Sequence, residues 1–255
     1  MKIGATGGLD RVDRLEELGF DLIEFSVGRI SALSPEGWAK ISGVLAGKNI
    51  AWHSCNGLFP GNITPLCRDE GMQESRAYLE RMLPILAEFG VKTVVFGSGS
   101  FRRMPEEIPQ ERRRQLIREF LVLLEGIARE NGIIVAVEPL NKLETNMLNT
   151  TAEAMEYIRE LDLPNLKLLV DLYHFWREGE PMERIYEYGP YIRHVHIAEP
   201  TNRDFLRGSD EYDYTPFFEA LRSIGYDGAV VFEGGKGDFD SGIGETYPVL
   251  RRLCE

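Results

Sequence analysis

The sequence predicts an α/β fold in which eight parallel strands close into a (β/α)8 (TIM) barrel. The first observation is a recurring unit, in which a helical segment ends, a glycine follows, and a β-branched run begins. It occurs four times, as EELGFDLIEF (16–25), AEFGVKTVVF (87–96), RENGIIVAVE (129–138) and RSIGYDGAVVFE (222–233). Glycine is favoured just past a helix, where φ is positive, and Val, Ile and Phe favour strands. The second observation is four more apolar runs, KIGA (2–5), IAWHS (50–54), LKLLVD (166–171) and IRHVHI (192–197), which make eight strands.

Helical patterns fill the segments between these strands. Apolar residues recur on one side of LDRVDRLEEL (9–18) and of QLIREFLVLLEGIARE (115–130). Pro84 predicts a kink or a division in the helix around 74–89. Thr215 and Pro216 are typical of an N-cap and a first helical residue. Strands that alternate with helices indicate a parallel sheet, and their number favours a closed barrel over an open doubly wound sheet. No linker interrupts the pattern, so we expect one domain over residues 1–255.

Composition excludes several classes of protein. The 255 residues include 41 acidic and 29 basic side chains, for a net charge of −12. This argues against nucleic acid or an anionic membrane as a partner, because both are bound through clustered Lys and Arg. The run Arg112–Arg114 is interpreted as an exposed helix face beside Glu111 and Glu119. No apolar run approaches the roughly 18 residues of a membrane span. The three scattered cysteines and the early polar residues predict a reduced, cytoplasmic protein without a signal peptide.

Polar side chains stand where four consecutive strands end. These residues are Glu138, Asp171, His196 and Glu233. In this barrel the carboxyl ends of the strands form the active-site face, so the four should meet there. Oxygen-rich sets with one imidazole suit a hard or borderline divalent ion such as Mn²⁺, Mg²⁺ or Co²⁺, with Zn²⁺ as a further choice. The alternative is that each residue simply begins a polar loop.

These motifs resemble a known family. EPLNKLE, VDLYH, HVHIAEPTNR and GYDGAVVFEGG, together with ELGFDLIEFSVG near the N-terminus, are similar to the xylose-isomerase-like sugar isomerases and epimerases. Within that group the resemblance is to ketose 3-epimerases of the D-tagatose 3-epimerase type. It implies one divalent ion, most simply Mn²⁺, held by Glu138, Asp171, His196 and Glu233, with the two glutamates as the acid/base pair. It also implies that the substrate is bound by His174, Arg203, Glu144 and Cys55.

The reaction implied is C3 epimerisation of a ketose through a metal-stabilised enediolate. One glutamate would remove the C3 proton and the other would return a proton to the opposite face. Aldose–ketose or hydroxypyruvate-type isomerisation and an inosose dehydratase-like elimination are close alternatives, because they begin with the same proton removal. An endonuclease IV-like nuclease and a non-catalytic binding subunit are remote ones. We expect a homodimer or homotetramer acting on a small sugar or sugar phosphate.

Two features leave the substrate open. In the ketose epimerases an arginine follows the metal histidine by six residues, whereas Arg203 follows His196 by seven and Asn202 holds the sixth place. The loop EGGKGDFDSGIG after the eighth strand carries Lys236, and loops in this position often bind phosphate. A phosphorylated sugar is therefore an alternative to a free one.

His194 and His196 lie two apart on one strand, so both should point into the barrel. His196 is closer to the carboxyl end and is predicted to be the metal ligand. His194 lies one layer deeper and is predicted to be a buried, hydrogen-bonded neighbour that supports the site.

Overall fold

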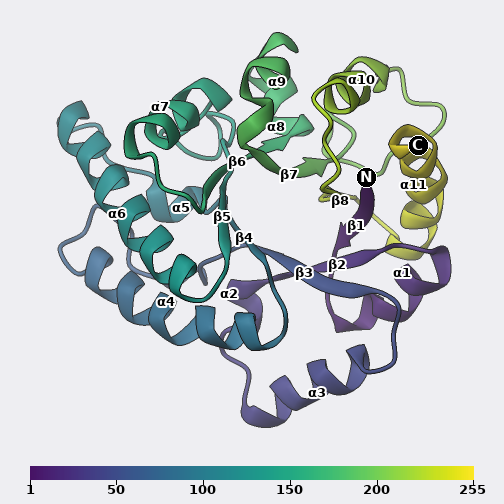
Figure 1. Cartoon of the computed structure of the whole chain (residues 1–255), viewed down its shortest axis with the longest axis horizontal. Helices are drawn as coiled ribbons and strands as arrows, with labels where there is room; N and C mark the ends of the chain where they lie inside the picture. Colours follow the sequence, from purple (N-terminus) through teal and green to yellow (C-terminus); the bar gives the residue numbers. More distant parts are fainter.

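The computed structural model describes all residues 1–255 and contains a closed barrel of eight parallel strands in chain order (Figure 1). β1 pairs with both β2 and β8, so the sheet has no open edge and the alternative of a doubly wound sheet is wrong. All eight predicted strands are confirmed. They are β1 (Lys2–Thr6), β2 (Leu22–Ser26), β3 (Ala51–Asn56), β4 (Thr93–Phe96), β5 (Ile134–Val137), β6 (Leu166–Asp171), β7 (Ile192–Ile197) and β8 (Ala229–Phe232).

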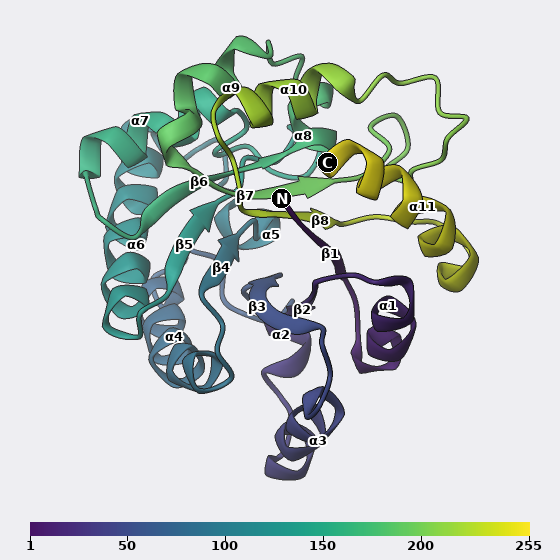
Figure 2. The ribbon, with the colours of Figure 1, turned by 45° about the vertical axis from the view of Figure 1, so that its right-hand side comes forward.

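Helices surround the ring of strands, and in the turned view α11 lies on the same side as α1 and β1 (Figure 2). They are η1 (Leu9–Arg11), α1 (Val12–Leu18), α2 (Val27–Ile30), α3 (Pro35–Leu45), α4 (Gly71–Glu88), α5 (Gly99–Arg102), α6 (Gln110–Glu130), α7 (Thr151–Leu161), α8 (Leu172–Arg177), α9 (Glu183–Tyr188), η2 (Gly189–Tyr191), α10 (Thr215–Ser223) and α11 (Phe239–Cys254). None of them combines the length and the apolar character that a membrane crossing requires.

The glycines of the repeated unit have the conformation that the pattern predicts. Gly19, Gly90, Gly132 and Gly225 have φ values of 94°, 86°, 66° and 69°. This left-handed region is strained for residues with a Cβ, which explains why glycine recurs where each helix turns into the next strand.

Two local predictions need correction. α4 runs without a break through Pro84, so the proline does not divide the helix. α10 begins at Thr215 itself, and the threonine side chain does not cap it. The Asp213 carboxylate accepts a hydrogen bond from the Thr215 N–H at 2.9 Å instead. A carboxylate near a helix N-terminus satisfies a free N–H and interacts favourably with the helix dipole.

The hydrophobic core has two unequal parts. The larger cluster contains 66 buried residues, among them the apolar faces of the helices that pack on the strands. Val95, Ala136 and Leu169 form a separate cluster on neighbouring strands. Leu169 is in register with the inward-facing His194, so this small cluster lies inside the barrel. Elsewhere the interior contains aliphatic side chains, such as Leu22 and Val231, together with polar ones, such as Glu24 and His194.

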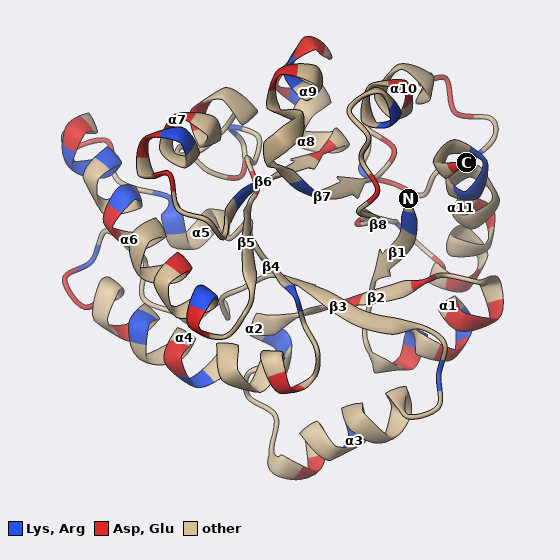
Figure 3. Ribbon diagram, viewed as in Figure 1, with Lys and Arg blue, Asp and Glu red and all other residues tan.

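Charged residues are spread over the surrounding helices (Figure 3). The prediction of an exposed face for the basic run of α6 is confirmed for Arg112, whereas Arg113 and Arg114 are half-buried. Arg112 pairs with Glu119 at 3.4 Å, and Arg114 pairs with Glu156 of α7 at 2.9 Å. Exposed pairs of this kind contribute little to stability individually, about 0–1 kcal/mol.

Arg102, by contrast, is completely buried next to the end of β5. Its guanidinium donates hydrogen bonds to the carbonyl oxygens of Phe96 at 3.0 Å, Glu138 at 2.8 Å and Leu148 at 3.4 Å. It therefore ties the ends of β4 and β5 to the loop that follows β5. Burial lowers the pKa of Arg102 to about 10, so the side chain remains charged near neutral pH.

We expect Arg102→Leu to lower the free energy of unfolding by about 3 kcal/mol, because it removes three buried hydrogen bonds and leaves the Glu138 carbonyl group without a donor. Urea unfolding followed by circular dichroism measures the change. The neighbouring Arg103 is exposed, and Arg103→Leu is the matched control. Equal stability of the two variants would contradict the role assigned to Arg102.

Candidate active site

The structure brings together the four residues predicted as metal ligands at the carboxyl end of the barrel. Glu138 and Glu233 directly follow β5 and β8, while Asp171 and His196 lie on β6 and β7. One ligand atom from each residue lies within 4.8 Å of all the others. His196 Nδ1 is 3.2 Å from Glu138 Oε1 and 3.3 Å from Glu233 Oε2.

Glu24 on β2 was missed by sequence reasoning, although it supports this cluster directly. Its carboxylate accepts hydrogen bonds from Nε2 of both His194 and His196, each at 2.9 Å. The side chain is completely buried. Burial alone would raise the pKa of Glu24, but His196 and His194 lower it to about 2. The available signal was an acid in the middle of the apolar strand LIEF.

His194 thus has the position predicted for it. It is buried one layer below His196 and bonds to the same carboxylate. Because Glu24 engages His196 Nε2, the Nδ1 atom is the one that faces Glu138 and Glu233. A carboxylate on the distal nitrogen is the usual way in which proteins orient an imidazole toward a metal ion.

The pKa values of the two glutamates are shifted in opposite directions. Burial raises the pKa of Glu138, and the nearby Glu233 carboxylate raises it further. Burial opposes ionisation of Glu233 as well, but His196 and Arg203 outweigh it and lower the pKa of that carboxyl. Asn56 also donates a hydrogen bond from Nδ2 to Glu233 Oε1. Two carboxyls whose environments separate their pKa values in this way are suited to acid and base roles.

His174, in α8, is buried beside Asp171 and acts as a neutral group. Its Nδ1 accepts a hydrogen bond from the Asn141 N–H at 3.1 Å, which places the ring proton on Nε2. Burial and the Arg203 charge lower the pKa of His174 to about 2. His174 Nε2 and Asp171 Oδ2 lie 3.5 Å apart, and neither has a hydrogen-bond partner in the chain.

Arg203 reaches the cluster despite its extra residue of spacing from His196. It adopts a left-handed backbone conformation, with φ of 55°, in the tight loop after β7. Its Nη2 lies 2.7 Å from Glu233 Oε2 and 3.6 Å from Asp171 Oδ2. Burial would lower the pKa of Arg203, but these carboxylates outweigh burial and raise it. Asn202, at the spacing seen in the family, does not reach the cluster and instead bonds through its N–H to Glu199.

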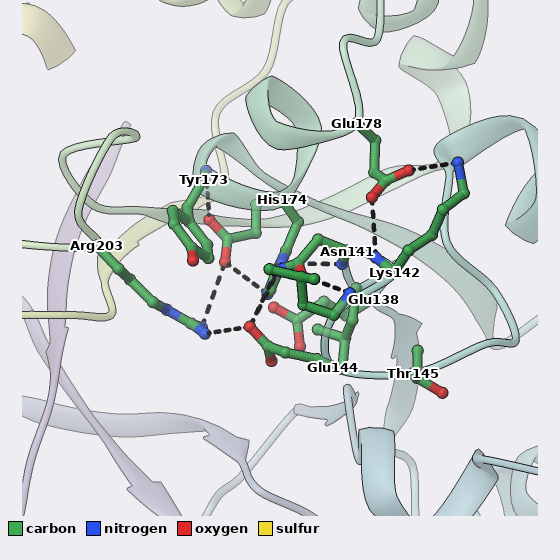
Figure 4. Close-up of polar contacts among 12 residues, drawn as sticks. Glu138, Asn141, Lys142, Glu144, Thr145, Tyr173, His174, Glu178 and Arg203 are labelled. Atoms are coloured by element: carbon green, nitrogen blue, oxygen red, sulfur yellow. Dashed lines mark hydrogen bonds and ion pairs between the residues drawn. The ribbon is translucent and has the colours of Figure 1, made fainter.

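Glu144 contacts the other terminal nitrogen of the Arg203 guanidinium. Its Oε1 lies 3.3 Å from Arg203 Nη1 and accepts a hydrogen bond from Asn141 Nδ2 at 3.0 Å. Figure 4 shows Arg203 and Glu144 extending toward each other, with His174 and Asn141 beside them. Residues from α8 and from the loops after β5 and β7 therefore form one connected polar wall.

A cavity of about 800 Å³ opens over the cluster. Glu138, Glu144, Arg203 and Glu233 line it, and Leu140 is its only hydrophobic lining residue. Three further lining residues have positively charged side chains, namely Arg11, Arg29 and Lys236. A surface of this composition suits a hydroxylated, strongly hydrated molecule.

Cys55, predicted to contact the substrate, does not reach this cavity. It is completely buried in the hydrophobic core, and its Sγ accepts a hydrogen bond from Trp52 Nε1 at 3.1 Å. Side chains alternate along a strand, so the next residue, Asn56, lines the cavity in its place.

Gly97, just past β4, is a second residue that sequence reasoning missed. A Cβ at this position would overlap the carboxylate of Glu138. Only glycine therefore allows Glu138 to lie where it contacts His196. The motif VVFGSGS showed a glycine at a strand end, which by itself did not identify the neighbour it must accommodate.

The donor set fits a divalent metal ion. Three carboxylates and one imidazole converge from four strands, and they are the ligand types that Mn²⁺, Mg²⁺, Co²⁺ and Zn²⁺ accept. Asp171 Oδ2 is buried without a hydrogen-bond partner, an arrangement that is costly unless a cation is bound.

Comparisons with known proteins agree with the fold. The family model described as "Xylose isomerase-like TIM barrel" matches residues 12–252. A 3-dehydro-D-guloside 4-epimerase of Escherichia coli (strain K12) is 30% identical over 89% of this chain and 86% of its own. A ketose 3-epimerase of Arthrobacter globiformis is 30% identical over 99% of this chain and 88% of its own.

Solved structures give the same result. The apo structure of a 3-keto-D-glucoside 4-epimerase from E. coli is 27% identical, covers 99% of this chain and 98% of its own, and has a TM-score of 0.82. A D-psicose 3-epimerase with D-fructose, 22% identical, has a TM-score of 0.86 and shows the likeness of fold alone. With its closed barrel, its convergent strand ends and a family match over nearly its whole length, this chain belongs to the xylose isomerase-like TIM barrel family.

Proposed function

We propose that this protein is a metal-dependent sugar epimerase that inverts the carbon next to a carbonyl group, with C3 of a ketose as the first assignment. The observation that carries the proposal is the pair Glu138 and Glu233, which approach His196 Nδ1 from two strands with pKa values shifted in opposite directions. Relatives that share 30% identity over most of the chain are named as epimerases, which supports this reaction class.

Glu138, Asp171, His196 and Glu233 would hold the metal ion, and Mn²⁺ is our choice for its identity. When bound, a divalent ion supplies Lewis-acid stabilisation of the negative charge that develops on the carbonyl oxygen. The carboxylate-rich set with one imidazole is the reason to prefer a hard or borderline ion.

The protein's own residues would carry the proton transfers. Glu233, kept ionised by His196 and Arg203, takes the proton from C3 on one face of the sugar. Glu138, whose pKa is raised by burial, donates a proton to the opposite face of the planar enediolate and so inverts the centre. His174 Nε2–H and the Arg203 guanidinium donate hydrogen bonds to sugar oxygens near the carbonyl, and Glu144 accepts one from a hydroxyl group.

A second candidate is inversion of C4 in a 3-keto-glycoside. It requires the same removal of a proton next to a carbonyl. The cavity of about 800 Å³ favours it, because a free hexose fills only part of that space. The positively charged side chains of Arg11, Arg29 and Lys236 line the cavity and suit a phosphate group. A phosphorylated sugar is therefore an alternative substrate. A cytoplasmic location and a homodimer or homotetramer stay predictions.

Hydrogen exchange from the solvent tests the proposal. With Mn²⁺ in deuterated water, we expect deuterium to enter the inverted carbon, C3 of a ketose or C4 of a 3-keto-glycoside, as seen by NMR. Glu138→Gln and Glu233→Gln should each reduce the rate by about 10²- to 10⁴-fold, since each removes a proton-transfer group. A metal-loaded protein that exchanges neither carbon in a panel of free, phosphorylated and glycosidic ketoses would overturn the assignment.

Metal binding can be checked separately from catalysis. We expect Asp171→Asn to weaken Mn²⁺ binding by about 10-fold or more in a calorimetric titration, because it removes one charged ligand. Asp69→Asn removes the same charge from an exposed position and is the control. If both variants bind Mn²⁺ like the parent protein, the ligand assignment is wrong.

Gly97→Ala should lower kcat by about 100-fold, because the new methyl group displaces the Glu138 carboxylate by an ångström or more. Gly126→Ala, in α6, adds a methyl group where nothing lies within 4 Å and serves as the control. Thermal melts of both variants separate displacement of Glu138 from loss of folding. An unchanged kcat in a folded Gly97→Ala variant would argue against the position given to Glu138.

A further inference from the structure

A second cavity lies at the opposite, amino-terminal end of the barrel. Its volume is about 260 Å³, and residues at or near the starts of β1, β2, β3, β4, β7 and β8 line it. It shares no lining residue with the large cavity over the candidate active site. In TIM barrels this end usually serves stability, so a polar cavity here requires its own explanation.

The charge lining this basal pocket is the reverse of the charge of the whole chain. Lys2, Lys92 and Arg193 line it, and Asp227 is its only acidic residue. None of the three cations forms an ion pair or a side-chain hydrogen bond within the chain. Their positive field is felt by His53 in the same pocket, whose pKa is lowered by burial and then by Lys2 and Lys92. A concave surface with three unpaired cations attracts anions.

The wall of the pocket contains polar groups that have no partner. Ser54 is buried, with 3% of its surface exposed, and its Oγ has no hydrogen bond. His194, which is also buried, uses Nε2 to bond to Glu24, while its Nδ1 has no partner in the chain. Buried polar groups in folded proteins are nearly always hydrogen-bonded, so the unpaired hydroxyl of Ser54, a residue that lines the pocket, leaves a donor for a ligand or solvent.

We propose that the basal pocket is a binding site for a small oxyanion of the inorganic phosphate type. Lys2, Lys92 and Arg193 supply the positive charge, and the Ser54 hydroxyl is a hydrogen-bond donor to an anion oxygen. A multiply charged oxyanion uses several donors at once, which a halide cannot do. The site does not depend on the reaction proposed for the other end of the barrel.

Inorganic phosphate is the probe for this site. Isothermal titration of the full-length protein at low ionic strength should show saturable binding of one phosphate per chain. The double variant Lys92→Gln/Arg193→Gln should weaken binding at least 10-fold, because both side chains are exposed at the rim and their loss leaves the core intact. Ser54→Ala should also weaken binding without lowering the Tm, because the hydroxyl that it removes has no partner in the free protein.

Two double variants locate the site. Arg29→Gln/Lys236→Gln removes cations from the large cavity, and Arg76→Gln/Arg112→Gln removes the same charge from the outer helices. Both should bind phosphate like the parent protein. No saturable binding by the parent protein would overturn the proposal. An equal loss of binding in either control variant would also overturn it. A loss in Arg29→Gln/Lys236→Gln would place the anion in the large cavity, and a loss in Arg76→Gln/Arg112→Gln would show only a general effect of net charge.

Discussion

Glu24 inside the barrel is the group on which the arrangement of the candidate active site depends. Its two carboxylate oxygens bind His194 and His196, one at each level of β7. A completely buried carboxylate is stable only when charged or polar partners surround it, and removing one partner of such a pair typically costs about 3–5 kcal/mol. The same contacts decide that His196 directs Nδ1 toward the strand ends. The interior of this barrel therefore contains a buried acid as well as aliphatic side chains.

The three carboxylates above Glu24 bring like negative charges close together. Glu138, Asp171 and Glu233 repel one another, and the chain offsets this with His196 below and Arg203 above. The offset is incomplete, because burial and the neighbouring acids still raise the pKa of Asp171 to about 7, although Arg203 opposes them. A bound cation would complete it. The charge balance of the strand ends therefore supports the proposed metal site, as do their ligand types.

Precise placement of these acids depends on residues outside the predicted ligand set. Gly97 leaves the space that the Glu138 carboxylate occupies, and Arg102 holds the backbone of Glu138 by its carbonyl oxygen. Polar groups also continue through the barrel, since His194 reaches the basal pocket at the other end. The two ends are thus linked by three side chains, His196, Glu24 and His194, that are hydrogen-bonded in series.

The sequence by itself determined the eight strands and the acids and histidine at the ends of β5 to β8, because helix-capping glycines, β-branched runs and polar residues at strand ends are local signals. It did not identify Glu24, Gly97 or Arg102, whose partners lie on other strands and loops and become neighbours only when the barrel closes. Cys55 shows the same limit, since one step along a strand moves a side chain from the cavity to the core. For Arg203 the tertiary structure decided the outcome, because a left-handed turn compensates for the extra residue and brings the guanidinium to Glu233.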